Sequence, residues 1–120
     1  MTDRIAAEFL DSWARAHTAR DWDALVAMYT RDALFFGSTP ALAVGHADIR
    51  AYFVALAPHA EPSVDFDVIA SRAVTPDVVE VASVATFRWA GNPGVPIRFT
   101  HTLVNRDGAW LAAGHHASPH

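Results

Sequence analysis

Residues 98–118, RFTHTLVNRDGAWLAAGHHAS, decide the fold of the C-terminal half of the chain. Apolar residues and His101 alternate there with arginine and threonine, and this period of two predicts a β-strand with one apolar face. The segment Arg106-Asp107-Gly108 has the residue types of a tight hairpin turn. The stretch therefore predicts a β-hairpin whose strands carry His101 and the adjacent pair His115 and His116.

Two further strands precede this hairpin. Residues 63–71, SVDFDVIAS, alternate apolar residues with Asp65 and Asp67, which predicts a strand with one solvated face. Residues 78–89, VVEVASVATFRW, continue the alternation. One face of this strand would carry Val79, Val81, Ser83, Ala85, Phe87 and Trp89. Turn sequences TPD and AGNPGVP separate the strands, so the second half of the chain predicts four antiparallel strands.

Helical spacing replaces this alternation in the first half of the chain. Apolar residues recur every three to four positions in residues 3–19, 22–30 and 46–57, which predicts three helices. Asp21 is suited to begin the second helix and Pro58 to end the third. Between them, residues 33–36, ALFF, predict a short strand, and GSTPALAVG predicts a loop.

The predicted order α-α-β-α-β-β-β-β defines an α+β fold. Helices that precede a set of long antiparallel strands bury their apolar stripes on one face of the sheet. We expect a cone-shaped, curved antiparallel sheet with the three N-terminal helices packed on its concave face. The mouth of such a cone is a natural ligand pocket.

The composition sets limits on the class of protein. A chain of 120 residues with 52% hydrophobic and 18% charged residues predicts a single globular domain over residues 1–120. No cysteine is present, so disulfides and thiolate ligands are excluded. The net charge of −4 and the scattered arginines argue against nucleic acid as a partner. The sequence has no signal-peptide core and no membrane-spanning run, so we expect a cytoplasmic protein that does not bind membranes.

Three stretches together resemble a known family. They are ARDWDALVAMYTRDALFFGS, GHADIRAYF and the hairpin quoted above, in which R-D-G-x-W is followed by H-x-S. Their order resembles the nuclear transport factor 2-like superfamily, which includes SnoaL-like and ketosteroid isomerase-like proteins, and most of all its SgcJ/EcaC- and kinase-association-domain-like branch. The resemblance implies a cone with a small-molecule pocket and a homodimer formed through the outer face of the sheet.

The same resemblance shows which chemistries are missing. Ketosteroid isomerase-like enzymes carry a general-base aspartate just after the first strand. Gly37 stands at that position here, and Trp13 stands where the family has a tyrosine on the first helix. The Asp-Arg-Asp set of the related epoxide hydrolases is not evident either.

The turn decides which histidine faces the pocket. With Arg106-Asp107-Gly108 as a three-residue loop, Phe99 lies opposite His115, and the inner face carries Phe99, His101, Leu103, Leu111, Ala113 and His115. Arg98, Thr100, Thr102, Trp110 and His116 would then face outward. A two-residue Asp-Gly turn would instead place His116 beside His101. The resemblance favours the three-residue loop.

This inner face predicts the site. His101 and His115 are the candidate catalytic residues, because an imidazole titrates close to neutral pH. The helix stripes and inner strand positions supply the candidate ligand-binding residues Trp13, Tyr29, Phe35, Tyr52, Phe53, Phe87 and Phe99. An aromatic wall of this kind favours a small apolar or aromatic molecule as the partner.

Two classes of function remain open on this evidence. One is a cofactor-free isomerase, cyclase or dehydratase that works by histidine-assisted proton transfer. The other is a non-catalytic module for ligand binding or oligomerisation. A carboxylate near His101 would favour the first, and none can be placed. Because neighbouring strand residues point to opposite faces, His115 and His116 cannot readily share a metal ion, so we expect no metal site.

Overall fold

The computed structural model describes residues 1–56 and 58–120. Their elements in chain order are α1 (Thr2–Thr18), α2 (Trp22–Ala27), β1 (Tyr29–Phe36), β2 (Ala43–Val44), α3 (Gly45–Ala55), β3 (Ser63–Thr75), β4 (Val78–Trp89), β5 (Asn92–Arg106) and β6 (Ala109–Pro119). The predicted α+β class is confirmed, and the predicted order holds except for the additional strand β2. Ala57, the predicted last residue of the third helix, lies outside the described residues.

The strands form one curved sheet with the order β2-β1-β6-β5-β4-β3. The pairs from β3 to β6 are antiparallel, as predicted, but β1 runs parallel to β6, so the sheet is mixed. Two predictions about the first half were therefore wrong. Tyr29 and Thr30, predicted in the second helix, belong to β1. The chain enters the sheet there, since the Met28 carbonyl accepts a hydrogen bond from the Ala112 amide at 2.8 Å.

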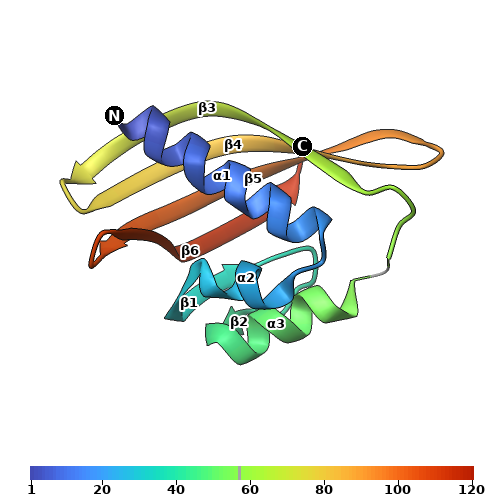
Figure 1. Cartoon of the computed structure of the whole chain (residues 1–120), viewed down its shortest axis with the longest axis horizontal. Helices are drawn as coiled ribbons and strands as arrows, with labels where there is room; N and C mark the ends of the chain where they lie inside the picture. Colours follow the sequence, from blue (N-terminus) through green and yellow to red (C-terminus); the bar gives the residue numbers. More distant parts are fainter. Residues whose placement is uncertain (57) are drawn as a thin grey trace.

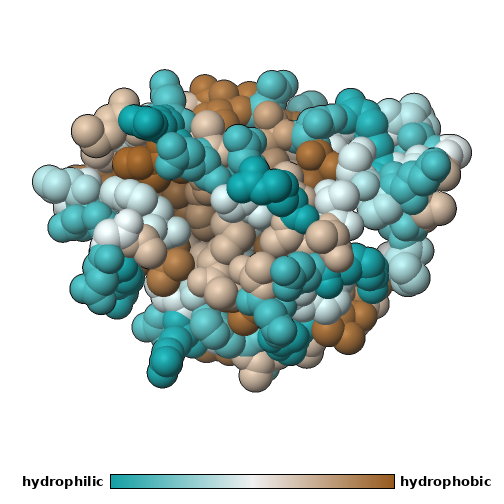
Figure 2. All heavy atoms as spheres, in the orientation of Figure 1, coloured by the Kyte–Doolittle hydropathy of each residue, from teal (hydrophilic) through white to brown (hydrophobic). Residues whose placement is uncertain are grey.

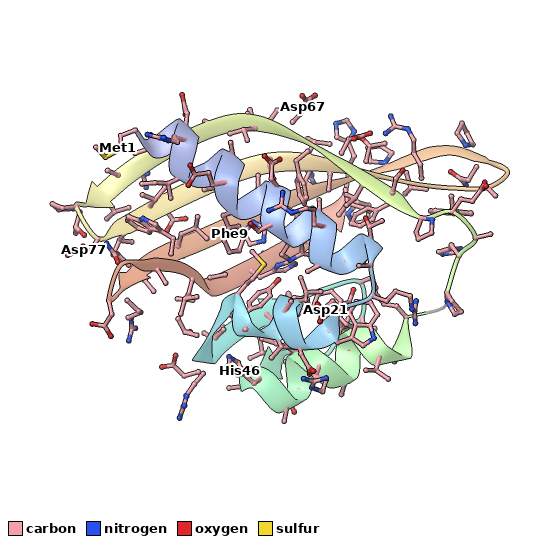
Figure 3. All side chains as sticks on the ribbon, viewed as in Figure 1. Met1, Phe9, Asp21, His46, Asp67 and Asp77 are labelled. Carbon is pink, nitrogen blue, oxygen red and sulfur yellow. The ribbon has the colours of Figure 1, made fainter. Side chains whose placement is uncertain are left out.

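The second wrong prediction concerns the loop of residues 37–45. The short strand β2 lies inside it and pairs with β1 through Leu34 and Phe35. Asp21 has its predicted role, since its carboxylate accepts a hydrogen bond from the Ala24 amide at the start of α2. Figure 3 shows Asp21 at the junction between α1 and α2.

Helices cover one face of the sheet. In Figure 1, α1 crosses the sheet on the side of β3 and β4, while α2 and α3 lie beside β1. Phe9 of α1 points toward the strands and is 5% exposed (Figure 3). On the strand side, Val79, Val81, Ser83 and Ala85 of β4 are all buried, as their alternation predicted. The core therefore lies between α1 and the inner face of β4, β5 and β6.

The last hairpin has neither of the two predicted registers. Arg106 pairs with Ala109 across a two-residue Asp107-Gly108 turn, whose φ angles of 54° and 89° are those that such turns require. A β-bulge then leaves Ala113 unpaired between the pairs Thr102–Gly114 and Leu103–Ala112. The two-residue turn alone would place His101 and His115 on opposite faces of the sheet, and the extra residue Ala113 returns them to the same face.

The bulge decides the contents of the inner face. His101 lies directly opposite His115, so these two histidines share the inner face as predicted, while His116 is exposed. The predicted pairing of Phe99 with His115 is wrong, because Phe99 pairs with Ala117. Between the turn and the bulge the faces are exchanged: Ala112 rather than Leu111 lies opposite Leu103, and Trp110 packs against the core instead of facing outward.

Candidate functional site

A cavity of about 580 Å³ opens at the end of the sheet where the β4–β5 turn and the C-terminus lie (Figure 1). Its walls come from the second half of α1, the start of α2, β1 and the end of α3. The sheet contributes the C-terminal ends of β4 and β6 and the first half of β5. Its volume is within the range of small-molecule sites. Eight aromatic side chains contribute to the wall: Trp13, Trp22, Phe35, Tyr52, Phe53, Phe87, Trp89 and Phe99. In the view of Figure 2, hydrophobic residues show between hydrophilic ones in small groups rather than as one broad patch.

Seven of the nine residues predicted for the site line this cavity. They are Trp13, Phe35, Tyr52, Phe53, Phe87, Phe99 and His115. The structure places the other two, Tyr29 and His101, beneath the floor, where each is 1% exposed. His101 is covered because the ring of Phe9 from α1 packs against it with 5.4 Å between centroids. A bound molecule would therefore meet His115, and His101 would act through it.

A chain of hydrogen bonds connects the floor residues. Trp13 Nε1 donates to the Tyr29 hydroxyl at 2.8 Å, and that hydroxyl lies 3.0 Å from His115 Nδ1. His101 Nε2 is also 3.0 Å from the same Nδ1 atom. The Phe35 ring stacks on His115 at 4.1 Å and holds it flat against the floor. All of these side chains are fully buried or nearly so, which fixes the orientation of His115.

The contacts of Nδ1 bear on which nitrogen of His115 carries the proton. Burial raises the pKa of Tyr29 well above its ordinary value, so the phenol keeps its proton. The phenol oxygen accepts from Trp13, and its proton can be donated to His115 Nδ1, the atom that also faces His101 Nε2. A neutral His115 with a bare Nδ1 carries its proton on Nε2.

The Nε2 atom of His115 is the polar atom that the floor offers to a ligand. It makes no hydrogen bond within residues 1–56 and 58–120, and it is not among the fully buried unpartnered atoms there. Because the ring lines the cavity, Nε2 is open to it. In the tautomer with a bare Nδ1, the floor presents an N–H donor to an apolar chamber.

Burial keeps the imidazoles of the site neutral. Desolvation lowers the pKa of His101 to about 3 and holds the pKa of His115 well below its ordinary value. Desolvation also lowers the pKa of His17 to about 4, with a further contribution from the charge of Arg20. At neutral pH, His115 is therefore an uncharged hydrogen-bond donor.

Gly37 shows why no carboxylate stands at the position where ketosteroid isomerase-like proteins have their base. A Cβ atom there would lie 2.3 Å from the Tyr52 ring. The Tyr52 hydroxyl is held by Ser38, whose amide and Oγ both lie 2.9 Å from it. Within the described residues, the lining of the cavity includes no aspartate or glutamate.

The mouth holds residues that the sequence did not single out as site residues. His17 stacks on Trp13 at 4.9 Å and lines the cavity together with Trp22 and Arg20. His17 lies four residues after Trp13 on the same stripe of α1, so the sequence allows it to enter the mouth or to lie at a solvated helix end, and the structure places it at the mouth. Arg20 follows α1 in a turn, where no periodicity marks the inward side, and Trp22 is the first residue of α2.

A metal centre finds no support in the described part of the chain, where no group of three or more histidine, aspartate or glutamate side chains could hold an ion. No helix of residues 1–56 and 58–120 is both long and apolar enough to span a bilayer.

The model of the SnoaL-like domain family matches residues 6–120. The chain belongs to this family. Solved structures of nuclear transport factor 2-like and ketosteroid isomerase-like proteins share its fold, as the sequence resemblance implied. No curated protein matches the chain.

Three solved structures show the shared fold of this SnoaL-like chain. A nuclear transport factor 2-like protein of unknown function from Shewanella oneidensis MR-1 has a TM-score of 0.84 at 15% identity, covering 98% of this chain and 99% of its own. A ketosteroid isomerase-like protein from Erwinia carotovora atroseptica has a TM-score of 0.81 at 17% identity, with coverages of 97% and 94%. A protein from Xanthomonas campestris named for the calcium/calmodulin-dependent protein kinase II association domain has a TM-score of 0.82 at 22% identity, with coverages of 96% and 85%.

Proposed function

We propose that this SnoaL-like domain binds a small, flat, largely apolar molecule whose oxygen accepts a hydrogen bond from His115 Nε2. The observation that carries the proposal is the position of this N–H donor at the inner end of an aromatic cavity of about 580 Å³. A carbonyl oxygen suits it best, because the donor is neutral and the surroundings are dry. In such surroundings one well-placed hydrogen bond orients the ligand.

Two naphthalene probes test this role of His115. 2-Acetylnaphthalene carries a carbonyl group, and 2-isopropenylnaphthalene has nearly the same shape with a CH₂ group in place of the oxygen. We expect the ketone to bind about tenfold more tightly, as one hydrogen bond of about 1.4 kcal/mol implies. Tryptophan fluorescence or titration calorimetry measures both affinities, because Trp13 and Trp22 line the cavity.

Two variants make the test specific to one nitrogen atom. His115→Phe keeps a ring stacked on Phe35 but removes the N–H, so the preference for the ketone should disappear while the alkene still binds. His116→Gln removes the neighbouring exposed imidazole and should leave the preference unchanged. Equal binding of the two probes to the wild type, or binding of neither, would overturn the proposal.

A second candidate function is proton transfer next to that carbonyl group. The observation that favours it is a second neutral imidazole in the same cavity: His17 stacks on Trp13 at 4.9 Å, and His115 lies 6.4 Å from the same ring. His17 would take a proton from the carbon beside the carbonyl. The electron pair of the broken C–H bond would form a C=C bond, and His115 would hold the resulting oxygen. A cofactor-free isomerase works by such a step.

Proton transfer ranks second because His17 is a weak base. Its pKa of about 4 is far from the neutral value at which a general base is most effective. Deuterium exchange at the methyl group of 2-acetylnaphthalene in D₂O, followed by NMR, separates the two functions. Exchange faster than in buffer, and lost in His17→Phe, would show catalysis. Binding without accelerated exchange would leave the domain a binding module.

A further inference from the structure

The charged groups around the cavity are unequally distributed. Two arginines, Arg20 and Arg88, line it, and within the described residues no acidic side chain does so. Arg88 is already neutralised, because its guanidinium forms an ion pair with Asp65. Arg20 forms no ion pair within residues 1–56 and 58–120.

The two carboxylates closest to Arg20 in the sequence are engaged elsewhere. Asp21 accepts a hydrogen bond from the Ala24 amide and begins α2. Asp23 pairs with Arg50 of α3. The charge of Arg20 is therefore left facing the mouth of the cavity without a local counter-ion.

The backbone and a neighbouring ring hold Arg20 at this place. Its φ angle of 55° is in the left-handed region, which is uncommon for a residue with a side chain and costs conformational energy. Its guanidinium lies over the Trp22 ring at 5.1 Å, a cation–π contact that keeps the charge beside the cavity. The influence of this charge reaches inward, since it contributes to the lowered pKa of His17.

A line of rings connects the floor to this arginine. His115, Trp13, His17 and Trp22 follow one another with centroid distances of 6.4, 4.9 and 6.1 Å, and Arg20 covers the last ring. Both His115 and Arg20 line the cavity, so a molecule that fills it would meet the His115 donor at one end and the guanidinium at the other. Its outer end would meet a positive charge.

From this arrangement we infer that the ligand is an aromatic carboxylic acid, bound with its carboxylate on Arg20 at the mouth and its carbonyl group on His115 at the floor. This inference rests on the proposed function, since it adds an anionic outer end to the same ligand. Arginine is suited to the role because its planar fork of N–H groups matches a carboxylate in geometry and charge.

Matched probes test the outer end of the ligand. 6-Acetyl-2-naphthoic acid and 6-acetyl-2-naphthamide share the carbonyl group and the ring system and differ in the charge at the far end. We expect the wild type to bind the acid about tenfold more tightly than the amide at low salt. This preference should fall to about twofold or less in Arg20→Gln. Arg15→Gln removes an exposed arginine of α1 that does not line the cavity, and it should leave the preference intact.

The possible results separate this inference from the proposed function. If the wild type binds the amide and the acid equally, the role of Arg20 is refuted while the pocket and its donor stand. If neither probe binds, the proposed function fails as well. Should Arg20→Gln unfold, the salt dependence of the wild type tests the role of Arg20 instead. At 1 M salt, charges are screened within about 3 Å, so the affinity for the acid must fall. The affinity for the amide, which carries no charge, must not fall.

Discussion

Acid should destabilise this fold through the two buried imidazoles of its floor. His101 is 1% exposed and His115 is 6% exposed. In the folded chain, desolvation holds the pKa of His101 at about 3 and that of His115 well below 6.5. In the unfolded chain both return to about 6.5, so the unfolded state binds more protons. The stabilisation is fully present above pH 6.5 and is lost as the pH falls toward about 3.

The size of the effect follows from one proton per histidine. Each proton that unfolding takes up lowers the free energy of unfolding by about 1.4 kcal/mol per pH unit. Between about pH 6 and pH 4, His101 should therefore remove about 2 kcal/mol. His115 should add a loss in the same direction, and the contribution of His101 alone is already a noticeable share of the roughly 5–15 kcal/mol that holds a typical domain folded.

Urea unfolding followed by tryptophan fluorescence at pH 6, 5 and 4 measures this loss. Carboxylates titrate in the same range, so the informative quantity is the difference between variants. His101→Phe keeps an aromatic ring against Phe9 and should reduce the loss by about 2 kcal/mol. The control His116→Gln removes an exposed imidazole and should lose as much stability as the wild type. A variant His101→Phe that loses stability as steeply as the wild type would refute the assignment of a buried neutral pair.

Three further predictions concern the scaffold of the site. Tyr29→Phe should cost about 1–3 kcal/mol in urea unfolding, because it leaves Trp13 Nε1 and His115 Nδ1 without their shared partner, and Trp13→Phe combined with it should cost less than the sum of the two. Gly37→Ala should cost about 1–3 kcal/mol, because the new Cβ atom would meet the Tyr52 ring, and Tyr52→Leu should relieve most of that cost. The chain should form a homodimer at tens of micromolar, an order of magnitude suited to a specific interface, and light scattering that shows a monomer there would contradict it.

The fold could be predicted because its determinants are local. The change from helical spacing to alternation after Pro58 separates the helices from the long strands, and Asp21 marks the start of α2 through a hydrogen bond within its own segment. A strand at residues 33–36 was predicted along the chain, but the place of β1 within the sheet could not be found in this way. Its parallel pairing with β6 joins residues about 80 positions apart, such as Leu34 with Gly114, and no local pattern records such a pair.

The register of the last hairpin shows a different limit. The sequence correctly indicated that His101 and His115 share a face, but the two-residue turn alone would have separated them. The unpaired Ala113 restores the alternation. The face that His115 occupies depends on two irregularities together, the length of the turn and the bulge. The favoured three-residue loop was wrong, and the only local sign of the bulge is Gly114 inside the strand.

The site was predictable where it lies on regular elements. Trp13, Phe53 and Phe87 could be assigned to the cavity from the stripes and faces of α1, α3 and β4. Depth could not be assigned, because Phe9 covers His101 while His115 stays open, and this difference depends on how α1 lies across the sheet. The role of Arg20 at the mouth was not predicted, because its position depends on its own left-handed backbone conformation between α1 and α2.

The two ends of the cavity differ in their contact with water, and this difference fixes the direction of a bound acid. At the floor, a carboxylate would lie among buried rings beside a neutral imidazole, with no counter-charge to offset its desolvation. At the mouth, Arg20 is exposed, and a carboxylate there keeps part of its hydration. Naphthalene-2,6-dicarboxylate should therefore bind at least about tenfold more weakly than 6-acetyl-2-naphthoate at pH 7, since one of its charges must enter the dry end. Titration calorimetry of the two compounds decides the matter, and equal affinity would mean that the floor is wet or that the ligand does not reach it.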